Sequence, residues 1–272
     1  EADMHSVREF PVTVKDVVFD RNTGRFYASV PSSAGAMGNS IARIDPVTGQ
    51  VENSVFIGSE PGKLALSDDG HTLYVSLDGA AAVRKFDITT QTAGQQFPLG
   101  DAGFSGPFFV KDLAVAPGQP DVVAVSRKNV TSSPDFEGVA IYDHGVQRTL
   151  TTPRHTGSDF IAFSASAATL FGSGTDFTGL QKLSVTPTGV SVVTSTPSGT
   201  GGDFKFDNGF LYLSFGQVFN GSTMLPAGTF TLTGLTSAPQ VEPDSSVSRV
   251  YFLTGDSAFG SNSRTMTIQA FD

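Results

Sequence analysis

The sequence contains no cysteine and no tryptophan, and only 16% of its 272 residues are charged. The missing thiols exclude a disulfide framework, thiolate catalysis and cysteine-ligated zinc or iron–sulfur centres. No apolar run approaches the roughly 20 residues that span a bilayer, and the opening residues EADMHSVREF lack the charged-then-apolar pattern of a signal sequence. We therefore expect a soluble chain from which any targeting peptide is already gone.

Positive charge is also scarce, with 17 Lys and Arg against 26 Asp and Glu and a formal net charge of −9. Phosphate backbones are bound by clustered cations, so we expect no nucleic-acid partner and no membrane insertion. The four histidines show no metal-ligand spacing, and no GxSxG motif marks a hydrolase nucleophile. The sequence therefore favours a non-enzymatic role, although it leaves enzymatic activity open.

What the chain does contain is typical of a turn-rich β protein, with 30 Gly, 15 Pro and 23 Phe and no long helical pattern. Low charge, an acidic balance and abundant Ser, Thr and Gly fit an exported bacterial module better than a cytoplasmic enzyme. We therefore expect an extracellular or cell-surface location.

Short apolar strands recur along the chain and indicate a repeated unit. They end at Asp20, Ser67, Ala116, Ser164, Asp207 and Asp244, which lie 37 to 49 residues apart. Each is followed by a polar turn and a second strand, as at 21–30, 68–77 and 246–255. Third strands are expected at 40–45, 82–87, 138–143, 180–185, 228–233 and 267–272, and fourth strands at 50–58, 95–100, 146–152 and 190–196.

Four antiparallel strands per unit form the blade of a β-propeller. The sequence thus predicts an all-β fold, a six-bladed β-propeller with four antiparallel strands per blade, and an incomplete or seven-bladed propeller is the alternative. We expect a single domain, 1–272, with blades at approximately 13–58, 59–106, 107–156, 157–200, 201–238 and 239–272 plus 5–12.

Residues 40–91, SIARIDPVTGQVENSVFIGSEPGKLALSDDGHTLYVSLDGAAAVRKFDITTQ, resemble the YVTN-type bacterial β-propeller repeat. They share its pieces ID..TG.V, G..P..LA.S.DG..LYV and V..FD..T. The resemblance extends to the third and sixth units but covers the fourth and fifth poorly, where FGSGTDFTG (171–179) and SFGQVFNGS (214–222) replace the usual loops. It implies a secreted or surface-anchored propeller, commonly of seven blades and often one segment of a longer protein, and it implies no single activity.

The last expected strand, within 264–272, has no fourth strand after it. The stretch HSVREFPV at 5–12 alternates like the fourth strands of other units. We expect it to pair beside 264–272, which would complete the last blade and close the propeller without a large unpaired edge.

Carboxylates occupy the first position of the innermost strand in every second unit. The equivalent residues are Asp16, Lys63, Asp112, Phe160, Asp203 and Gln240. Innermost strands line the channel of a propeller, so Asp16, Asp112 and Asp203 would lie at one level, where calcium would relieve their repulsion, with Asp159 and Gln240 as further candidate ligands. Alternatively, each Asp accepts hydrogen bonds from backbone amides where its strand begins, or pairs with Lys63 or solvent.

Most phenylalanines fall inside strand patterns and are expected in the core. Six lie in or near Gly- and Ser-rich loops and are candidates for an exposed interaction patch, unless these loops tuck over the blades. They are Phe104, Phe108, Phe136, Phe177, Phe219 and Phe259.

These features favour a non-enzymatic extracellular or surface propeller that acts as a binding, adhesion or self-assembly module through variable loops at 31–39, 101–108 and 126–137. Its partner would be a protein, a surface polymer or another copy of the chain. One alternative is a calcium-dependent hydrolase or lyase at the central channel, as in six-bladed lactonase-like propellers, although their fuller Glu and Asn ligand set is not evident here. The other is a purely structural spacer of a longer surface protein.

Deleting residues 1–12 is expected to destabilise the chain strongly, because the last blade would lose its fourth strand. Thermal unfolding followed by circular dichroism should show a midpoint lower by more than about 5 °C. Deletion of residues 1–4 alone is the control and should change little. A small loss on deleting 1–12 would favour an open or incomplete propeller.

Overall fold

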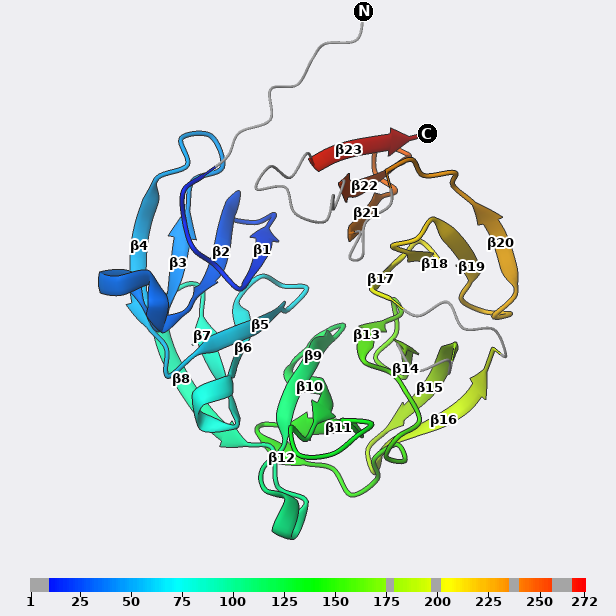
Figure 1. Cartoon of the computed structure of the whole chain (residues 1–272), viewed down its shortest axis with the longest axis horizontal. Coiled ribbons are helices and arrows are strands. Elements are labelled where there is room, and N and C mark those ends of the chain that lie inside the picture. The colour runs from blue at the N-terminus through cyan, green and yellow to red at the C-terminus, as the bar shows by residue number, and fades with distance from the viewer. Residues whose placement is uncertain (1–9, 175–178, 197–201, 235–239, 256–265) are drawn as a thin grey trace, which may run out of the picture. The chain divides into compact units, whose positions relative to one another are not determined.

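The computed structural model describes residues 10–174, 179–196, 202–234, 240–255 and 266–272, and the described chain is built almost entirely of β-strands (Figure 1). Within these ranges, consecutive strands form six antiparallel sheets, five with four strands and one with three. The sheets are the blades of a six-bladed β-propeller, as predicted. The chain divides into two compact units, Glu1–Pro98 and Leu99–Asp272.

The first unit holds blades 1 and 2. Blade 1 consists of β1 (Asp16–Asp20), β2 (Arg25–Val30), β3 (Ser40–Ile44) and β4 (Val51–Phe56). Blade 2 consists of β5 (Pro61–Leu66), β6 (Thr72–Leu77), β7 (Ala82–Asp87) and β8 (Thr92–Pro98). Two short 3-10 helices, η1 (Ser32–Met37) and η2 (Asp78–Ala80), lie in the connections from β2 to β3 and from β6 to β7. Tyr27 and Ile41 of blade 1 pack with Leu73, Val75 and Phe86 of blade 2 in one buried cluster, so the two sheets share a core.

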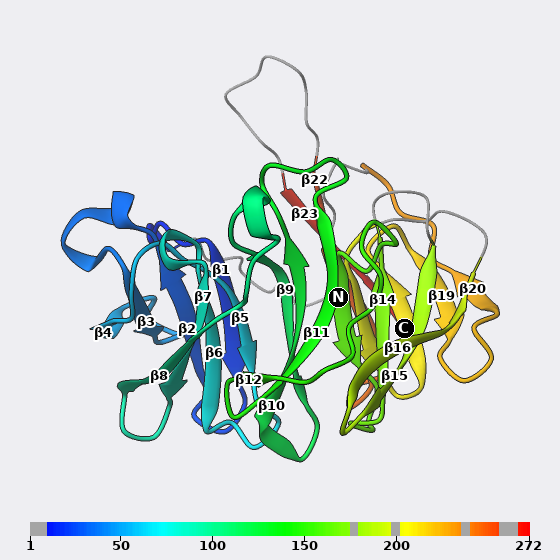
Figure 2. The same cartoon turned by 90° about the horizontal axis from the view of Figure 1, so that it is seen from below.

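The second unit begins with η3 (Gly103–Ser105) and holds blades 3 to 6. Blade 3 consists of β9 (Phe109–Ala116), β10 (Gln119–Lys128), β11 (Phe136–Asp143) and β12 (Val146–Gln147), and Figure 2 shows its strands from the side. Blade 4 consists of β13 (Phe160–Phe163), β14 (Thr169–Ser173), β15 (Leu180–Thr186) and β16 (Gly189–Ser195). Blade 5 consists of β17 (Phe204–Asp207), β18 (Phe210–Leu213), β19 (Gln217–Asn220) and β20 (Pro226–Thr229). Blade 6 has three described strands, β21 (Gln240–Asp244), β22 (Arg249–Gly255) and β23 (Met266–Phe271).

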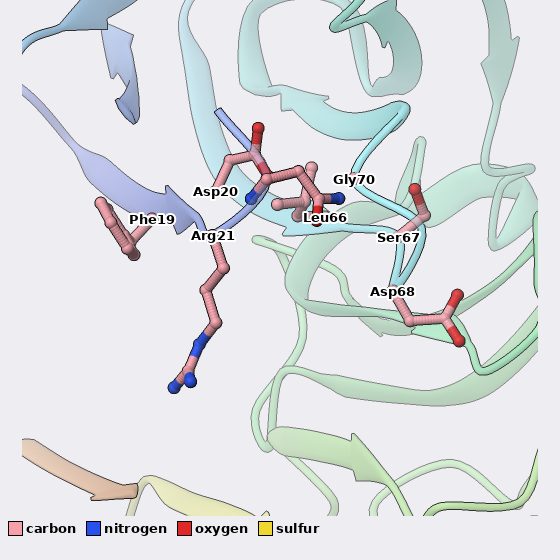
Figure 3. Close-up of a pocket in the computed structure, with 8 residues that line it drawn as sticks. Phe19, Asp20, Arg21, Leu66, Ser67, Asp68 and Gly70 are labelled. Atoms are coloured by element: carbon pink, nitrogen blue, oxygen red, sulfur yellow. The ribbon is translucent and has the colours of Figure 1, made fainter. Parts of the chain in front are cut away.

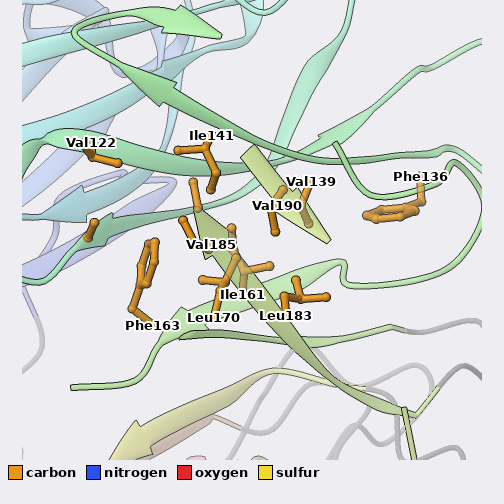
Figure 4. Packing of buried hydrophobic residues seen from close by; sticks show 12 residues of the cluster. Val122, Phe136, Val139, Ile141, Ile161, Phe163, Leu170, Leu183, Val185 and Val190 are labelled. Atoms are coloured by element: carbon orange, nitrogen blue, oxygen red, sulfur yellow. The ribbon is translucent and has the colours of Figure 1, made fainter. Parts of the chain in front are cut away.

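Blades 3 and 4 are held face to face by a cluster of buried aliphatic and aromatic side chains (Figure 4). Phe136 and Ile141 come from β11, and Ile161, Leu170 and Leu183 come from successive strands of blade 4. Burial of each such side chain contributes about 1.5 to 3 kcal/mol. The apolar side chains of the alternating strand pattern therefore pack between these neighbouring blades and hold them together.

Aspartates at the end of a strand or directly after it open the turns that follow, as the sequence indicates. Asp45 Oδ1 accepts hydrogen bonds from the N–H groups of Val47 and Thr48, at 2.7 and 2.9 Å. The bond from Thr48, then that from Val47, holds the pKa of Asp45 below its ordinary value. Asp87 binds the N–H of Thr90 in the same way, at 2.7 Å. The turns are thus formed locally, independently of the packing between blades.

One strand prediction is wrong. The third strand of blade 5 is β19, within a stretch that reads as a loop, and the segment expected as third strand at 228–233 contains the end of the fourth strand, β20. Gly216, with φ 91°, allows a tight connection in which its N–H donates to Leu213 O. The strand has only four residues and lies between Gly216 and Gly221, so its apolar pattern is too short to be recognised in the sequence.

The predicted N-terminal strand at 5–12 falls largely outside the described residues. Phe10 to Val12 are not in a strand, and the Phe10 ring lies against Gly49 in the turn between β3 and β4. The pairing with 264–272 stays a prediction. None of the helices in the described ranges has the length and apolar character needed to cross a bilayer.

Candidate functional site

Asp16, the first predicted site residue, links blade 1 to blade 2. Its Oδ2 accepts the N–H of Leu64 on β5 at 2.9 Å, and its Oδ1 accepts the N–H of Val17 at 2.9 Å. The preceding Lys15 places its Nζ 3.3 Å from the carboxylate of Glu60, at the start of blade 2. Lys15 Nζ also lies 4.0 Å from Asp78 Oδ2, so the Lys-Asp pair joins two blades through one backbone hydrogen bond and two ion pairs.

The same dipeptide performs the same task between blades 3 and 4. Asp112 Oδ2 accepts the N–H of Ile161 on β13 at 2.8 Å. Lys111 Nζ lies 2.6 Å from Asp159 Oδ1 and 2.7 Å from Asp135 Oδ1. We call each Lys-Asp dipeptide, with its partners in the following blade, an inter-blade clasp.

The second clasp stabilises the charged form of its lysine. Burial alone lowers the pKa of Lys111, but the hydrogen bonds and negative charges of Asp135 and Asp159 outweigh it and raise the pKa above its ordinary 10.5. Asp159 is 5% exposed, so its ion pair with Lys111 is largely shielded from solvent. Asp159, a further candidate calcium ligand in the sequence, is therefore a partner of Lys111.

Asp203 is placed differently from Asp16 and Asp112. Gly202 precedes it instead of a lysine, and its Oδ1 accepts the N–H of Phe204 at 2.8 Å. Blade 5 is tied to blade 6 at the other end of β17, where Asp207 accepts the N–H and the hydroxyl of Ser245 at 2.8 and 3.0 Å.

No three His, Asp or Glu side chains in the described parts of the chain are grouped so that they could hold a metal ion. Calcium at Asp16, Asp112 and Asp203 stays a prediction of the sequence. Asp16 and Asp112 each use one carboxylate oxygen for a backbone N–H of the next blade. The alternative role that the sequence suggests, a bond to a backbone N–H where the aspartate's own strand begins, is seen instead from Val17 to Asp16 and from Phe204 to Asp203.

Sequence analysis missed a row of buried hydroxyls. Near the end of each second strand lies a Ser or Thr that is at most 1% exposed, and these are Ser29, Ser76, Ser126, Ser173, Ser214 and Thr254. Ser29 is paired in register with Asp16, and its Oγ accepts the Asp16 N–H at 3.0 Å. Ser126 is paired with Asp112 and donates to Ser158 O in blade 4 at 2.7 Å. The tripeptides YAS (27–29), YVS (74–76) and YLS (212–214) recur in the sequence and could have indicated these serines.

Three of the six residues of the expected phenylalanine patch are buried, so the prediction is wrong for Phe108, Phe136 and Phe219. Phe136 begins β11 and Phe219 lies within β19, and both are buried because these strands face the core. Phe108 is buried beneath the Arg127 guanidinium, which lies 4.7 Å from its ring centroid. Phe177 and Phe259 lie outside the described residues.

Phe104 is the exception, because it is fully exposed on η3. The buried Asn129 donates from Nδ2 to Ser105 O at 2.9 Å, and the Thr131 hydroxyl lies 2.9 Å from the same oxygen. Asn129 Oδ1 accepts the Thr131 N–H at 2.8 Å. We call residues 101–108 the Phe104 loop, and these contacts brace it. Asn129 also begins the N-x-S/T glycosylation pattern NVT (129–131), and its burial makes this position inaccessible in the folded chain.

A polar network supports this loop from below. Arg127 Nη1 donates to Gln147 Oε1 at 3.0 Å, and its Nη2 donates to Glu137 O at 3.2 Å. The buried Glu137 carboxylate accepts from Arg154 Nη2 at 2.8 Å and from Ser132 Oγ at 3.2 Å. Hydrogen bonds to charged groups, made within blade 3 and the segment that follows it, therefore hold the base of the loop.

Each unit has a shallow pocket at its hairpin turns. The first, of about 190 Å³, lies between the β1–β2 and β5–β6 turns and is lined mostly by polar side chains such as Asp20, Arg21 and Asp68, with Phe19 and Leu66 (Figure 3).

The second pocket, of about 150 Å³, lies between blades 3 and 4 and is more apolar. Its lining includes Val122, Ala168, Val185 and Pro187, with Arg148 and Gln119. Arg148 donates to Thr186 O and to Asp143 Oδ2, each at 2.9 Å. We call it the blade 3–4 pocket.

If calcium binds at the predicted level, it should raise the melting temperature of the wild-type chain but not that of Asp16→Asn/Asp112→Asn/Asp203→Asn. Asparagine keeps an oxygen that can accept the clasp hydrogen bonds. The change in melting temperature caused by calcium therefore reports ion binding and not the loss of these hydrogen bonds. Equal wild-type melting temperatures with calcium and with chelator would contradict the site.

Lys111→Met should lower the free energy of unfolding at pH 7 by about 2 to 3 kcal/mol, because Asp159 would keep a charge without its cation. Lys111→Met/Asp159→Asn should recover part of this loss. Since the folded-state pKa of Lys111 is raised, the contribution of the pair is fully present below about pH 10.5 and is lost as the pH rises through the folded-state pKa. Urea unfolding from pH 7 to pH 11 measures this, and a loss under about 0.5 kcal/mol at pH 7 would contradict it.

No family model matches the chain, and no curated protein matches it in sequence. Among solved structures it is similar to hydrazine synthase of Kuenenia stuttgartiensis, with TM-score 0.57 and 13% identity over 100% of this chain and 70% of that one. It is also similar to a functionally unknown protein from Desulfotomaculum acetoxidans DSM 771, with TM-score 0.62 and 10% identity over 89% of this chain and 79% of that one. The third is the Cps50 (Swd1) β-propeller domain of Myceliophteria thermophila, with TM-score 0.55 and 12% identity over 98% of this chain and 74% of that one. At such identities the similarity shows the fold alone, a β-propeller.

Proposed function

We propose that the chain is a non-enzymatic binding module whose Phe104 loop docks a partner macromolecule. The observation that carries this proposal is a fully exposed phenylalanine on a loop braced by the buried Asn129. Aromatic side chains are enriched at protein interfaces, and burial of one contributes about 1.5 to 3 kcal/mol. A loop that is already ordered loses little entropy on binding.

Neighbouring groups support this role. Val130, between the two bracing residues, is 67% exposed and adds apolar surface. Beneath the loop, Arg127 and Phe108 form a stacked pair that holds its C-terminal end. The partner is a protein or a surface polymer, and another copy of the chain belongs to the first class.

The resemblance of residues 40–91 to the YVTN-type repeat and the acidic, Ser- and Thr-rich composition support an extracellular or cell-surface location. Brief protease treatment of intact source cells should release peptides of this chain. Recovery of the chain only from the cytosolic fraction would contradict the proposed location.

Phe104→Ala should weaken binding at least fivefold, since the loss of one buried aromatic ring removes more than about 1 kcal/mol. Two probes represent the partner classes: the immobilised wild-type chain and purified peptidoglycan sacculi. Phe56→Ala is the matched control, because Phe56 is 65% exposed on β4 in the first unit. The proposal would be overturned if the wild-type chain is retained on neither probe. It would also be overturned if Phe104→Ala leaves retention on both probes unchanged.

A further inference from the structure

The Phe104 loop and the blade 3–4 pocket lie at opposite ends of the same strand. The loop directly precedes Phe109, the first residue of β9, and Gln119 at the pocket follows Ala116, the last residue of β9. Eight strand residues span roughly 25 Å. The second unit therefore carries an apolar projection on one face and a depression on the other.

The pocket has space for an aromatic ring, and part of its wall is apolar. Its volume is about 150 Å³, and Val122, Ala168, Val185 and Pro187 contribute apolar walls. A volume of about 150 Å³ is enough for a benzene ring, the end group of phenylalanine, although this pocket is open and its wall also holds Gln119, Arg148 and Thr186. Arg148 is held at the pocket wall by Asp143 and by Thr186 O, so its guanidinium group is already ordered where an aromatic ring would enter.

We propose that Phe104 of one copy inserts into the blade 3–4 pocket of a second copy. This inference rests on the proposed binding function and specifies its partner as the chain itself. The two surfaces differ and lie on opposite faces of the second unit, so the contact is heterologous: the copy that inserts Phe104 keeps its own pocket free, and the copy that receives it keeps its own Phe104 free. Repetition of the contact therefore builds a row of copies.

The size of the contact determines when it forms. A phenylalanine buries about 150 to 250 Å², far below the roughly 1,200 to 2,000 Å² of a stable interface. The chain therefore remains monomeric in dilute solution and associates where its local concentration is high, as on a surface that carries many copies.

Because the chain has no cysteine, the contact can be tested by disulfide trapping with single-cysteine variants. Ser105→Cys is exposed beside Phe104, and Gln119→Cys is exposed at the pocket rim. Disulfides form only when the two Cα atoms come within about 7 Å. The two chains, one carrying a size tag, are mixed at high concentration, oxidised briefly and separated by electrophoresis.

The mixed disulfide should exceed its statistical share, half of all cross-linked dimers, and should form at least fivefold faster than either self-dimer. Phe104→Ala in the Ser105→Cys chain, or Ala168→Glu in the Gln119→Cys chain, should return the mixture to the statistical ratio. Phe56→Ala in either chain should leave the excess unchanged. Circular dichroism confirms that each variant is folded.

A statistical mixture that Phe104→Ala does not alter would overturn this inference. If Phe104→Ala still weakens retention on sacculi or on the immobilised chain, the binding function stands and only the assignment of the pocket fails. If Phe104→Ala has no effect in either assay, both proposals fail.

Discussion

Blade 1 is joined to blade 2, and blade 3 to blade 4, by a hydrogen bond from the backbone of the later blade to an aspartate of the earlier one. Consecutive blades share no strand, so their relative position within a unit depends on side chains. Asp16 accepts the N–H of Leu64, and Asp112 accepts that of Ile161. An N–H left without an acceptor there would cost about 1 to 3 kcal/mol. These bonds set the register in which the apolar faces of the paired blades meet, and the shared cores depend on that register.

The clasp between blades 3 and 4 also reaches the Phe104 loop. Lys111 binds Asp135, and Asp135 O accepts the N–H of Asn129 at 2.8 Å, which closes the segment 129–135. The same segment supplies the Asn129 and Thr131 groups that brace Ser105. A single chain of contacts thus runs from the junction between two blades to the exposed ring of Phe104. The surface proposed for binding is therefore rigid because the blades are joined.

The strands and the number of blades were predictable, since apolar alternation and turn-opening aspartates are local signals. The roles of Asp16 and Asp112 were not, because their partners lie 48 and 49 residues further along the chain. The short β19 was hidden between glycines, and its position decided that Phe219 is buried. Phe104 and Phe136 have similar Ser- and Gly-rich surroundings in the sequence, and only the strand that begins at Phe136 separates a core residue from an exposed one.

The exposure of Phe104 requires an explanation in terms of energy. A loop free to move would tuck this ring against the blade and gain about 1.5 to 3 kcal/mol. The hydrogen bonds that Asn129 and Thr131 make each contribute about 0.5 to 1.5 kcal/mol, and together they are comparable with that gain. They also satisfy the buried amide of Asn129, which would otherwise lack partners. The bracing therefore suffices to hold the ring in solvent, where its burial energy is still available for association with a partner.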